Sequence, residues 1–328
     1  MIVITGGAGF IGSNLAAALT ERGAVDIVVC DWLGHGDKWR NLAKHEIADF
    51  VSPEGLFTFL DLNESRIQAI VHLGAVTSTT ETDGDLTIRS NFELSLSLWR
   101  WCSEQRVRFI YASSAATYGD GAHGFDDDGS PQGLAKLHPL NLYGWTKHAF
   151  DRRVARLVAA GGAQPPQWAG LKFFNVYGPN EYHKGAMKSV VHQIYSDVAA
   201  GLPATLFRSH RAEYSDGGQI RDFIWVGDCA AAMLWLLDNR EVSGLFNLGT
   251  GKARSFLDLA RAVFRALGKE PNIRFVDTPS EIRAKYQYFT EATMTRLRAA
   301  GFTDPFASLE EGVARYVRDY LAGPDPYR

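Results

Sequence analysis

The chain has 328 residues, of which 46% are hydrophobic and 22% are charged, and its formal net charge is −3. This is the composition of an ordinary soluble globular protein, without the global basicity that would favour a nucleic-acid partner. The longest apolar stretch, near AAAMLWLL, is too short to span a bilayer. Cys30, Cys102 and Cys229 lie far apart without metal-ligand spacing. We therefore expect reduced core thiols, no metal and no membrane contact, in a cytoplasmic protein.

Short β-branched runs alternate with amphipathic stretches through the first half of the chain. We expect strands at MIVIT, DIVVCD, HEIADF, AIVHLGA, VRFIYASS and LKFFNVYG. The runs are apolar nearly throughout, as a parallel sheet covered on both faces requires. The predicted fold is α/β, a Rossmann-type doubly wound parallel sheet with a smaller α/β C-terminal substrate lobe. Residues 1–175 plus about 223–250 would form the dinucleotide-binding domain, and about 176–222 plus 251–328 the substrate-binding domain.

The first predicted strand leads directly into a glycine-rich turn. VITGGAGFIGSNLAAAL places Gly7, Gly9 and Gly12 in a G-x-G-x-x-G pattern after a strand and at the opening of a helix. Glycines let the backbone approach a pyrophosphate, whose charge is met by amide N–H groups and by the helix dipole. In this context the pattern predicts a dinucleotide site; the alternative is merely a tight strand-to-helix turn.

The second predicted strand ends at Asp31, where a carboxylate accepts hydrogen bonds from an adenosine ribose, and this alone favours NAD. Lys38 or Arg40, just downstream, could instead neutralise a 2′-phosphate, and we predict NADP held by Lys38, with NAD as the alternative. Asp49 and Phe50 would flank the adenine, or else be a surface carboxylate and a core aromatic. Further cofactor-binding candidates are Phe10, Ile11, Trp32, Leu73, Gly74, Ala75, Val76, Thr77, Asn91 and Val176.

The stretch LNLYGWTKHAF sets Tyr143 and Lys147 four positions apart at the start of an amphipathic pattern. In a helix they share a face, near enough for an ammonium to act on a phenol. The fifth strand ends in IYASSAATYG and brings Ser114 to the sheet edge where open α/β sheets bind ligands. Each feature alone is ordinary, but beside a dinucleotide loop they predict a Ser, Tyr, Lys trio. Tyr143 would take a hydroxyl proton, and Ser114 would hold the oxygen as hydride leaves its carbon.

These motifs, the glycine loop, the serine strand end and Tyr143-x-x-x-Lys147, resemble the extended short-chain dehydrogenase/reductase superfamily over essentially the whole chain. More narrowly, FFNVYGPNEYHKGAMKSV, IRDFIWVGD, LFNLGTGKARSF and AKYQYFTEATMTRLRAAGF resemble the ADP-glycero-manno-heptose 6-epimerase family of lipopolysaccharide core assembly. The resemblance implies an isomerase that oxidises carbon 6 of an ADP-heptose to a ketone with a bound nicotinamide cofactor. Hydride then returns to the other face. It also implies a homo-oligomer, specifically a homopentamer.

The resemblance assigns the two acid/base roles to Tyr143 and to Lys184 in EYHKGAM, with Ser114 and Lys147 completing the catalytic set. Lys147 and Lys184 would also contact the cofactor; without the resemblance, Lys184 would be a phosphate-binding or solvated lysine. Predicted substrate-binding residues are Ser114, Asn175, Ala186, Gln193, Phe207, Arg208, Ser209, His210, Arg221 and Tyr286. Arg221 is the best candidate for a bidentate phosphate contact. Ala186 departs from the family, which usually has a substrate-contacting serine there.

Two other functions share parts of this pattern. A nucleotide-sugar dehydratase, reductase or 4-epimerase of the same superfamily would keep the fold and the trio. Dehydratases tend to carry acidic residues just after the strand-end serine, where this chain has Ala115, Ala116 and Thr117. A non-catalytic dinucleotide sensor would lack the tyrosine or the lysine. Both are present, so an enzyme is favoured.

Overall fold

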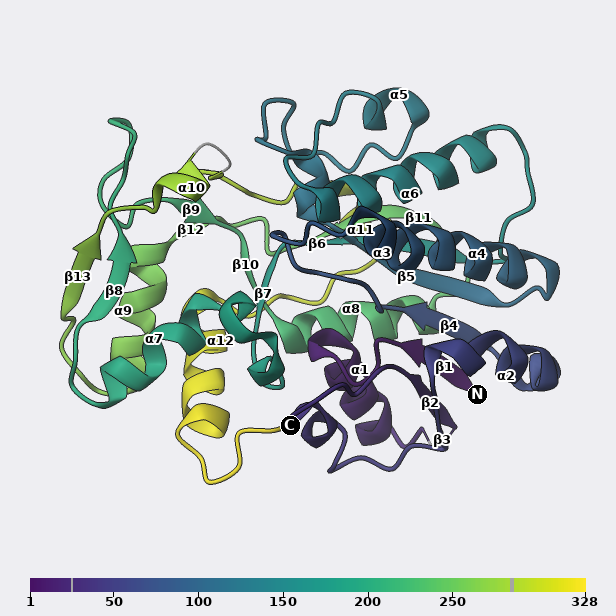
Figure 1. The fold of residues 1–328 in the computed structure, drawn as a ribbon, viewed down its shortest axis with the longest axis horizontal. Coiled ribbons are helices and arrows are strands. Elements are labelled where there is room, and N and C mark those ends of the chain that lie inside the picture. Colours follow the sequence, from purple (N-terminus) through teal and green to yellow (C-terminus); the bar gives the residue numbers. More distant parts are fainter. Residues whose placement is uncertain (25, 284–285) are drawn as a thin grey trace.

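A seven-stranded sheet forms the larger part of the computed structural model, which describes residues 1–24, 26–283 and 286–328 (Figure 1). Its strand order is β11-β6-β5-β4-β1-β2-β3, and all neighbouring strands are parallel. The strands are β1 (Ile2–Thr5), β2 (Ile27–Cys30), β3 (Asp49–Val51), β4 (Ala69–His72), β5 (Arg108–Ser114), β6 (Trp168–Phe173) and β11 (Gly244–Leu248). The predicted Rossmann-type α/β fold is confirmed.

Most predicted strands differ from the observed ones by a few residues at an end, and two of them differ in a way that affects the sheet. The run HEIADF forms a strand only from Asp49 onward, in the short edge strand β3. The run LKFFNVYG divides at Phe174 into β6 and β7 (Asn175–Tyr177). The division arises because β6 pairs with β5 and β11, whereas β7 leaves that sheet and pairs with β10 (Phe223–Trp225).

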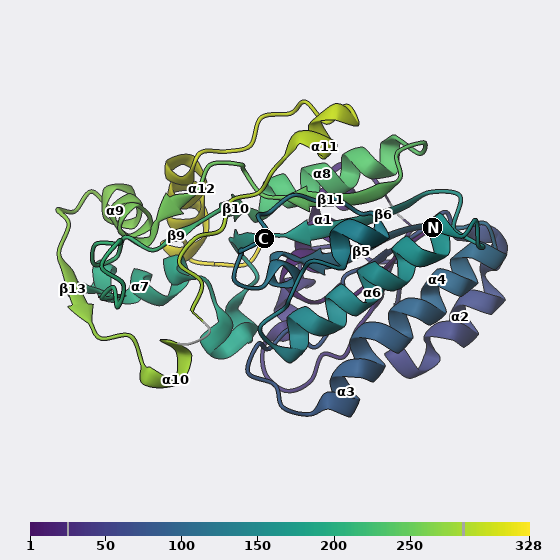
Figure 2. The ribbon, with the colours of Figure 1, turned by 90° about the horizontal axis from the view of Figure 1, so that it is seen from above.

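Helices cover both faces of the sheet, as its apolar strands require. One face packs against α1 (Phe10–Glu21), α8 (Val226–Asp238) and α11 (Thr295–Ala299). The other packs against α2 (Leu56–Leu62), α4 (Leu94–Glu104) and α6 (Leu142–Ala159), which lie side by side in Figure 2. Among the described residues, none of the helices combines the length and apolar character that a membrane crossing would need. The three cysteines are buried free thiols, as predicted.

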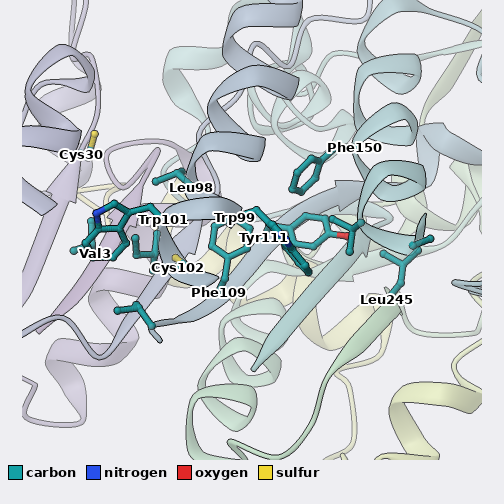
Figure 3. Close-up of a cluster of buried hydrophobic side chains, with 14 of the residues drawn as sticks. Val3, Cys30, Leu98, Trp99, Trp101, Cys102, Phe109, Tyr111, Phe150 and Leu245 are labelled. Carbon is teal, nitrogen blue, oxygen red and sulfur yellow. The ribbon is translucent and has the colours of Figure 1, made fainter. Parts of the chain in front are cut away.

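An aromatic cluster joins α4, β5 and α6 (Figure 3). Trp99 meets Phe109 edge to face at 6.3 Å between ring centroids, and Phe109 stacks on Tyr111 at 5.8 Å. Phe150 of α6 contacts Tyr111 edge to face at 4.9 Å. Such pairs contribute roughly 0.5–1.5 kcal/mol each beyond the area they bury. The cluster therefore fixes α6 against β5, the two elements that carry the predicted trio.

The second lobe, on the left of Figure 1, is built from short strand pairs and helices around a core of its own. The pairs are β8 (Ala204–Phe207) with β13 (Ile273–Val276), and β9 (Ile220–Arg221) with β12 (Arg254–Ser255). Its helices are α7 (Val190–Ala199), α9 (Phe256–Ala266), α10 (Ser280–Arg283) and α12 (Leu309–Arg315). The exact boundaries of the two predicted domains stay a prediction.

The remaining elements are short helices and turns that connect the two lobes and the strands. They are α3 (Gly84–Ile88), α5 (Pro131–Leu134), η1 (Lys38–Asn41), η2 (Pro53–Gly55), η3 (Glu64–Arg66), η4 (Arg89–Glu93), η5 (Ala115–Tyr118), η6 (Tyr182–Met187) and η7 (Tyr316–Leu321). Of these, η1, η5 and η6 contribute residues to the cavity described next or lie beside it.

Candidate active site

A cavity of about 1150 Å³ runs along the carboxyl ends of the sheet strands and into the second lobe. Ligands of open α/β sheets bind at this edge. The cavity brings together most of the predicted site residues: Gly9, Phe10, Ile11, Gly12, Asp31, Lys38, Leu73, Gly74, Ala75, Thr77, Ser114, Tyr143, Lys147, Asn175, Val176, Lys184, Arg221 and Tyr286.

The glycine turn forms one wall of the cavity and has the shape that a pyrophosphate needs. A Cβ at Gly12 would collide with the carbonyl oxygen of Gly6, so the turn closes only with glycine there. Helix α1 begins after Gly9 without a side-chain cap, which leaves the first helical N–H groups available to an anion at the cavity wall. Gly7 instead packs against Val29 of β2, outside the cavity. The turn fits a dinucleotide phosphate.

At the end of β2, Asp31 is held by two neighbours. The N–H of Ala8 donates to Oδ2 of Asp31 at 3.0 Å, and Nζ of Lys38 lies 2.7 Å from its Oδ1. Lys38 also donates to the carbonyl oxygen of Trp32 at 2.7 Å. The Lys38 ammonium therefore forms an ion pair with the Asp31 carboxylate. The sequence analysis instead expected it to bind a 2′-phosphate.

Three predicted cofactor-binding residues lie outside the cavity, at or near the β3 edge of the sheet. Trp32 is 53% exposed and donates through Nε1 to Glu54. Asp49 and Phe50 are also exposed, in the three-residue edge strand β3. Their contact with a cofactor stays a prediction.

The predicted trio converges where α6 meets the end of β5. Asn141 caps α6 by accepting a hydrogen bond from the N–H of Gly144 at 2.8 Å, which places Tyr143 and Lys147 in the first two turns. A Cβ at Gly144 would lie 2.7 Å from the carbonyl oxygen of Ala116, so the glycine allows α6 to approach the segment just after Ser114. Ser114 itself accepts a hydrogen bond from the N–H of Ala116 at 3.1 Å.

Burial governs the charges of the trio. It raises the pKa of Tyr143 above its ordinary value, while the hydrogen bond with Ser114 opposes that rise. It also lowers the pKa of Lys147 to about 8, against the attraction of Asp151. Lys147 is thus an ammonium at neutral pH, and it loses its proton when the pH rises above about 8.

Asp151, two turns after Tyr143 on α6, ties this helix to the sheet. Its carboxylate accepts hydrogen bonds from the hydroxyls of Ser113 at 2.6 Å and Tyr111 at 3.1 Å. The ammonium of Lys172 lies 3.1 Å away, and both partners of this ion pair are fully buried. The pair holds the tyrosine helix and the serine strand in one relative position.

Asn91 and Val76 play a similar structural part rather than lining the cavity. The amide of Asn91 accepts from the N–H of Val76 at 2.8 Å and donates to its carbonyl at 2.9 Å. It also donates to the hydroxyl of Thr146 in α6 at 3.1 Å. Asn91 therefore ties the segment after β4 to α6. Direct cofactor contact by either residue stays a prediction.

Lys184 lines the cavity from η6. Its Nζ lies 5.0 Å from the centroid of the Phe10 ring, at the start of α1. Burial lowers the pKa of this lysine, and the nearby Glu181 carboxylate opposes that shift. A partly desolvated amine with a lowered pKa is suited to exchanging protons.

Arg221 forms the second-lobe end of the cavity. Its guanidinium lies 5.6 Å from the Phe256 ring centroid and 5.4 Å from that of Tyr286. It donates to the carbonyl of Ile220 at 2.8 Å and to that of Gln287. A fixed, buried guanidinium is a suitable phosphate contact.

The other predicted substrate residues do not line the cavity. Arg208 is paired with Asp216 and Asp277 on the surface, and Ser209 and His210 bond to the hydroxyl of Tyr288. Gln193 donates to the carbonyls of Ala186 and Lys188. The remaining two, Phe207 and Ala186, are also outside it.

The cavity also contains residues that the sequence analysis missed. They include Ser78, Thr79, Thr80, Leu140, Asn141, His183, Ser189, Gln287 and Thr290. Asn141 and Ser189 carry a sequence signal, since each is a helix N-cap residue directly before an amphipathic run. Gln287 had none, because only folding brings it to donate to the carbonyl of Gly119.

Comparisons with known proteins agree with this geometry. Residues 2–249 match the NAD dependent epimerase/dehydratase family. An ADP-L-glycero-D-manno-heptose-6-epimerase from Nitratidesulfovibrio vulgaris (strain DP4) is 48% identical over 332 aligned positions, covering 100% of both chains. The chain belongs to this epimerase family. The resemblance inferred from the motifs is confirmed, and the protein is an enzyme of the isomerase class.

Solved structures of nucleotide-sugar epimerases have the same fold as this epimerase. The Helicobacter pylori ADP-L-glycero-D-manno-heptose-6-epimerase superposes with a TM-score of 0.80 at 27% identity, over 97% of this chain and 95% of its own. The UDP-glucose 4-epimerase of Thermus thermophilus, solved with NAD, gives a TM-score of 0.72 at 26% identity, over 95% and 96%. Both similarities span the two lobes of the epimerase.

Proposed function

We propose that this epimerase converts ADP-D-glycero-D-manno-heptose to ADP-L-glycero-D-manno-heptose through a transient carbon-6 ketone, using a bound nicotinamide cofactor. The observation that carries the proposal is the convergence of Tyr143, Ser114 and Lys147 with Lys184 on one cavity that begins at a glycine turn. When bound, the cofactor accepts the hydride from carbon 6 and returns it, and its oxidised ring adds positive charge beside the trio.

Tyr143 acts as the base toward one face of carbon 6. Its phenolate takes the hydroxyl proton, and the Ser114 hydroxyl holds the oxygen as it becomes a carbonyl. Lys147, one turn along α6, stabilises the phenolate by its positive charge and positions the nicotinamide ribose. Because burial raises the pKa of Tyr143, the base depends on these neighbouring charges.

Lys184 acts on the second face. It lines the cavity from η6, whereas Tyr143 lines it from α6, which packs on the sheet. After the ketone rotates within the cavity and presents its other face, a proton supplied by Lys184 completes the opposite epimer. The cofactor is restored in each cycle and stays bound.

For the cofactor we propose NAD. Asp31 ends β2 with a carboxylate that would repel a 2′-phosphate, and the Lys38 ammonium is committed to Asp31 and to the carbonyl of Trp32. The NAD-dependent family and the NAD-bound relative from Thermus thermophilus support the same choice. The prediction of NADP through Lys38 is decided by identifying the nucleotide released from denatured protein. Release of NADP would overturn our proposal.

The decisive experiment supplies the purified epimerase with each carbon-6 epimer of ADP-glycero-manno-heptose and resolves the products. Without an epimeric product the substrate assignment fails. A single turnover from each epimer, followed by reduced-nicotinamide absorbance, separates the two faces. Tyr143→Phe should lose the signal from one epimer and Lys184→Met from the other, with cofactor retained in both variants.

The predicted homo-oligomer, a pentamer by resemblance, is tested by the mass of the protein in solution.

A further inference from the structure

Glu181 is a fully buried carboxylate that the mechanism above does not use. Its Oε2 accepts a hydrogen bond from the N–H of Ser189 at 2.5 Å, and its Oε1 accepts one from the Ser189 hydroxyl at 2.5 Å. The hydroxyl of Tyr316 in η7 donates to Oε1 at 2.9 Å. A buried carboxylate is costly unless it is bonded in this way, so these contacts fix its position firmly.

Glu181 and Ser189, which these bonds join, lie at the two ends of one loop. Glu181 directly precedes η6 (Tyr182–Met187), and Ser189 follows it as the N-cap of α7 (Val190–Ala199). The carboxylate therefore closes residues 182–188 into a loop whose base is anchored to a helix N-terminus, where a negative charge is favourable. Gly185 inside the loop has φ 54°, a backbone conformation that favours glycine and makes the closed path possible.

This closed loop presents Lys184 to the cavity. The backbone N–H of Lys184 donates to the carbonyl of Glu181 at 3.1 Å, so the lysine begins within the turn that the carboxylate anchors. Its ammonium reaches the Phe10 ring at the cavity wall. Among the described residues, Glu181 is the charged group that acts on Lys184, and it favours the ammonium form.

We propose that Glu181 is a positioning residue for Lys184, and that its bonds to Ser189 hold the 182–188 loop in the one shape that aims the lysine at the second face of carbon 6. The inference rests on the proposed role of Lys184 and deepens it. Tyr143 is anchored separately, through Asn141 and Asp151, so loss of Glu181 damages one half of the reaction and not the other.

Three variants test the loop. Glu181→Ala removes all three bonds. Glu181→Gln keeps the shape, because its amide oxygen can accept from the Ser189 N–H while both hydroxyls rotate to accept from the amide nitrogen. Ser189→Ala removes one bond. Asp228→Asn is the matched control, since Asp228 also anchors a loop, through the N–H of Ala307 at 2.8 Å, but does not line the cavity.

The readout is the single turnover from each epimer, together with steady-state epimerisation. Glu181→Ala should lower the single-turnover rate from the epimer that needs Lys184 about 100-fold, the effect of a displacement of about 1 Å. The rate from the epimer that needs Tyr143 should stay within about threefold of the parental rate. Ser189→Ala should show a smaller loss on the same epimer, and Glu181→Gln should recover most of the loss. In the Lys184→Met background, Glu181→Ala should add nothing.

The outcomes separate the two proposals. If Lys184→Met epimerises at the parental rate, the role of Lys184 fails. If Lys184→Met is inactive while Glu181→Ala retains the parental rate, the role of Glu181 fails. Equal slowing of both epimers, or further loss in the double variant, would show a general structural effect and would also overturn the inference. Should Glu181→Ala not fold, the Glu181→Gln and Ser189→Ala measurements decide.

Discussion

Gly144 offers the sharpest test of how the fold builds the trio, because it lies directly after Tyr143 and against the segment after Ser114. A Cβ added at Gly144 would lie 2.7 Å from the carbonyl oxygen of Ala116, whereas ordinary contact begins at 3.4 Å. The α6 start and η5 must therefore separate by roughly 0.5–1 Å in Gly144→Ala to restore van der Waals contact. That displacement separates Tyr143 from Ser114 without changing either side chain.

The expected cost is catalytic rather than thermodynamic. A misplacement of this size lowers kcat by roughly 10- to 100-fold. Alanine is the better helix former by up to about 1 kcal/mol, which offsets part of the strain, so the free energy of unfolding should change little. Cofactor should remain bound, since the glycine turn is untouched.

The assay compares kcat for epimerisation, retained cofactor and urea unfolding in the parent, Gly144→Ala and Gly84→Ala. Gly84 is the matched control, because it also lies in the first turn of a helix but a Cβ there meets nothing within 4 Å. Gly84→Ala should keep the parental kcat. If Gly144→Ala also keeps kcat within about twofold, the close approach of α6 to η5 does not set the trio geometry.

Three further predictions concern charge. Asp151→Asn leaves the buried Lys172 ammonium without its partner and should cost roughly 3–5 kcal/mol in urea unfolding; a loss under about 1 kcal/mol would contradict this. Burial lowers the pKa of Lys147 from 10.5 to about 8, so the unfolded chain binds more protons between these values. The free energy of unfolding should therefore rise from pH 8 to 10.5 relative to Lys147→Met, and parallel slopes would refute the burial argument. Arg221→Lys loses the planar fork and should raise KM about tenfold or more with a smaller change in kcat; an unchanged KM would remove Arg221 as a phosphate contact.

The features predicted correctly from the sequence are those whose signal is local. A strand, three glycines and a helix follow one another within one segment, so the turn and its position could be predicted from residue types alone. Tyr143 and Lys147 share a helix, and their spacing fixes a common face. The position of Ser114 at the sheet edge could be predicted from the rule that parallel strands present their carboxyl ends at one edge.

The features that sequence reasoning missed depend on contacts between distant segments. Nothing near Lys38 in the sequence indicates that its ammonium would turn back to Asp31, and the exposed edge position of Phe50 follows from the short pairing of β3. Asn91 was predicted as a cofactor contact, which stays a prediction, and the structure shows that its amide bonds to Val76 and Thr146. Side-chain hydrogen-bond partners of this kind are set by tertiary packing, which single-sequence patterns do not encode.

If Tyr143 is the base of the proposed mechanism, its burial would make proton transfer depend on what occupies the cavity. Desolvation raises the pKa of Tyr143, so the side chain is a neutral phenol and a poor base when only Ser114 and the protein interior surround it. The Lys147 ammonium, whose pKa is about 8, supplies positive charge up to that pH, and an oxidised nicotinamide would supply more. In the proposed mechanism, Tyr143 would therefore be a stronger base when an oxidised, positively charged nicotinamide ring lies beside it than when no such ring is bound.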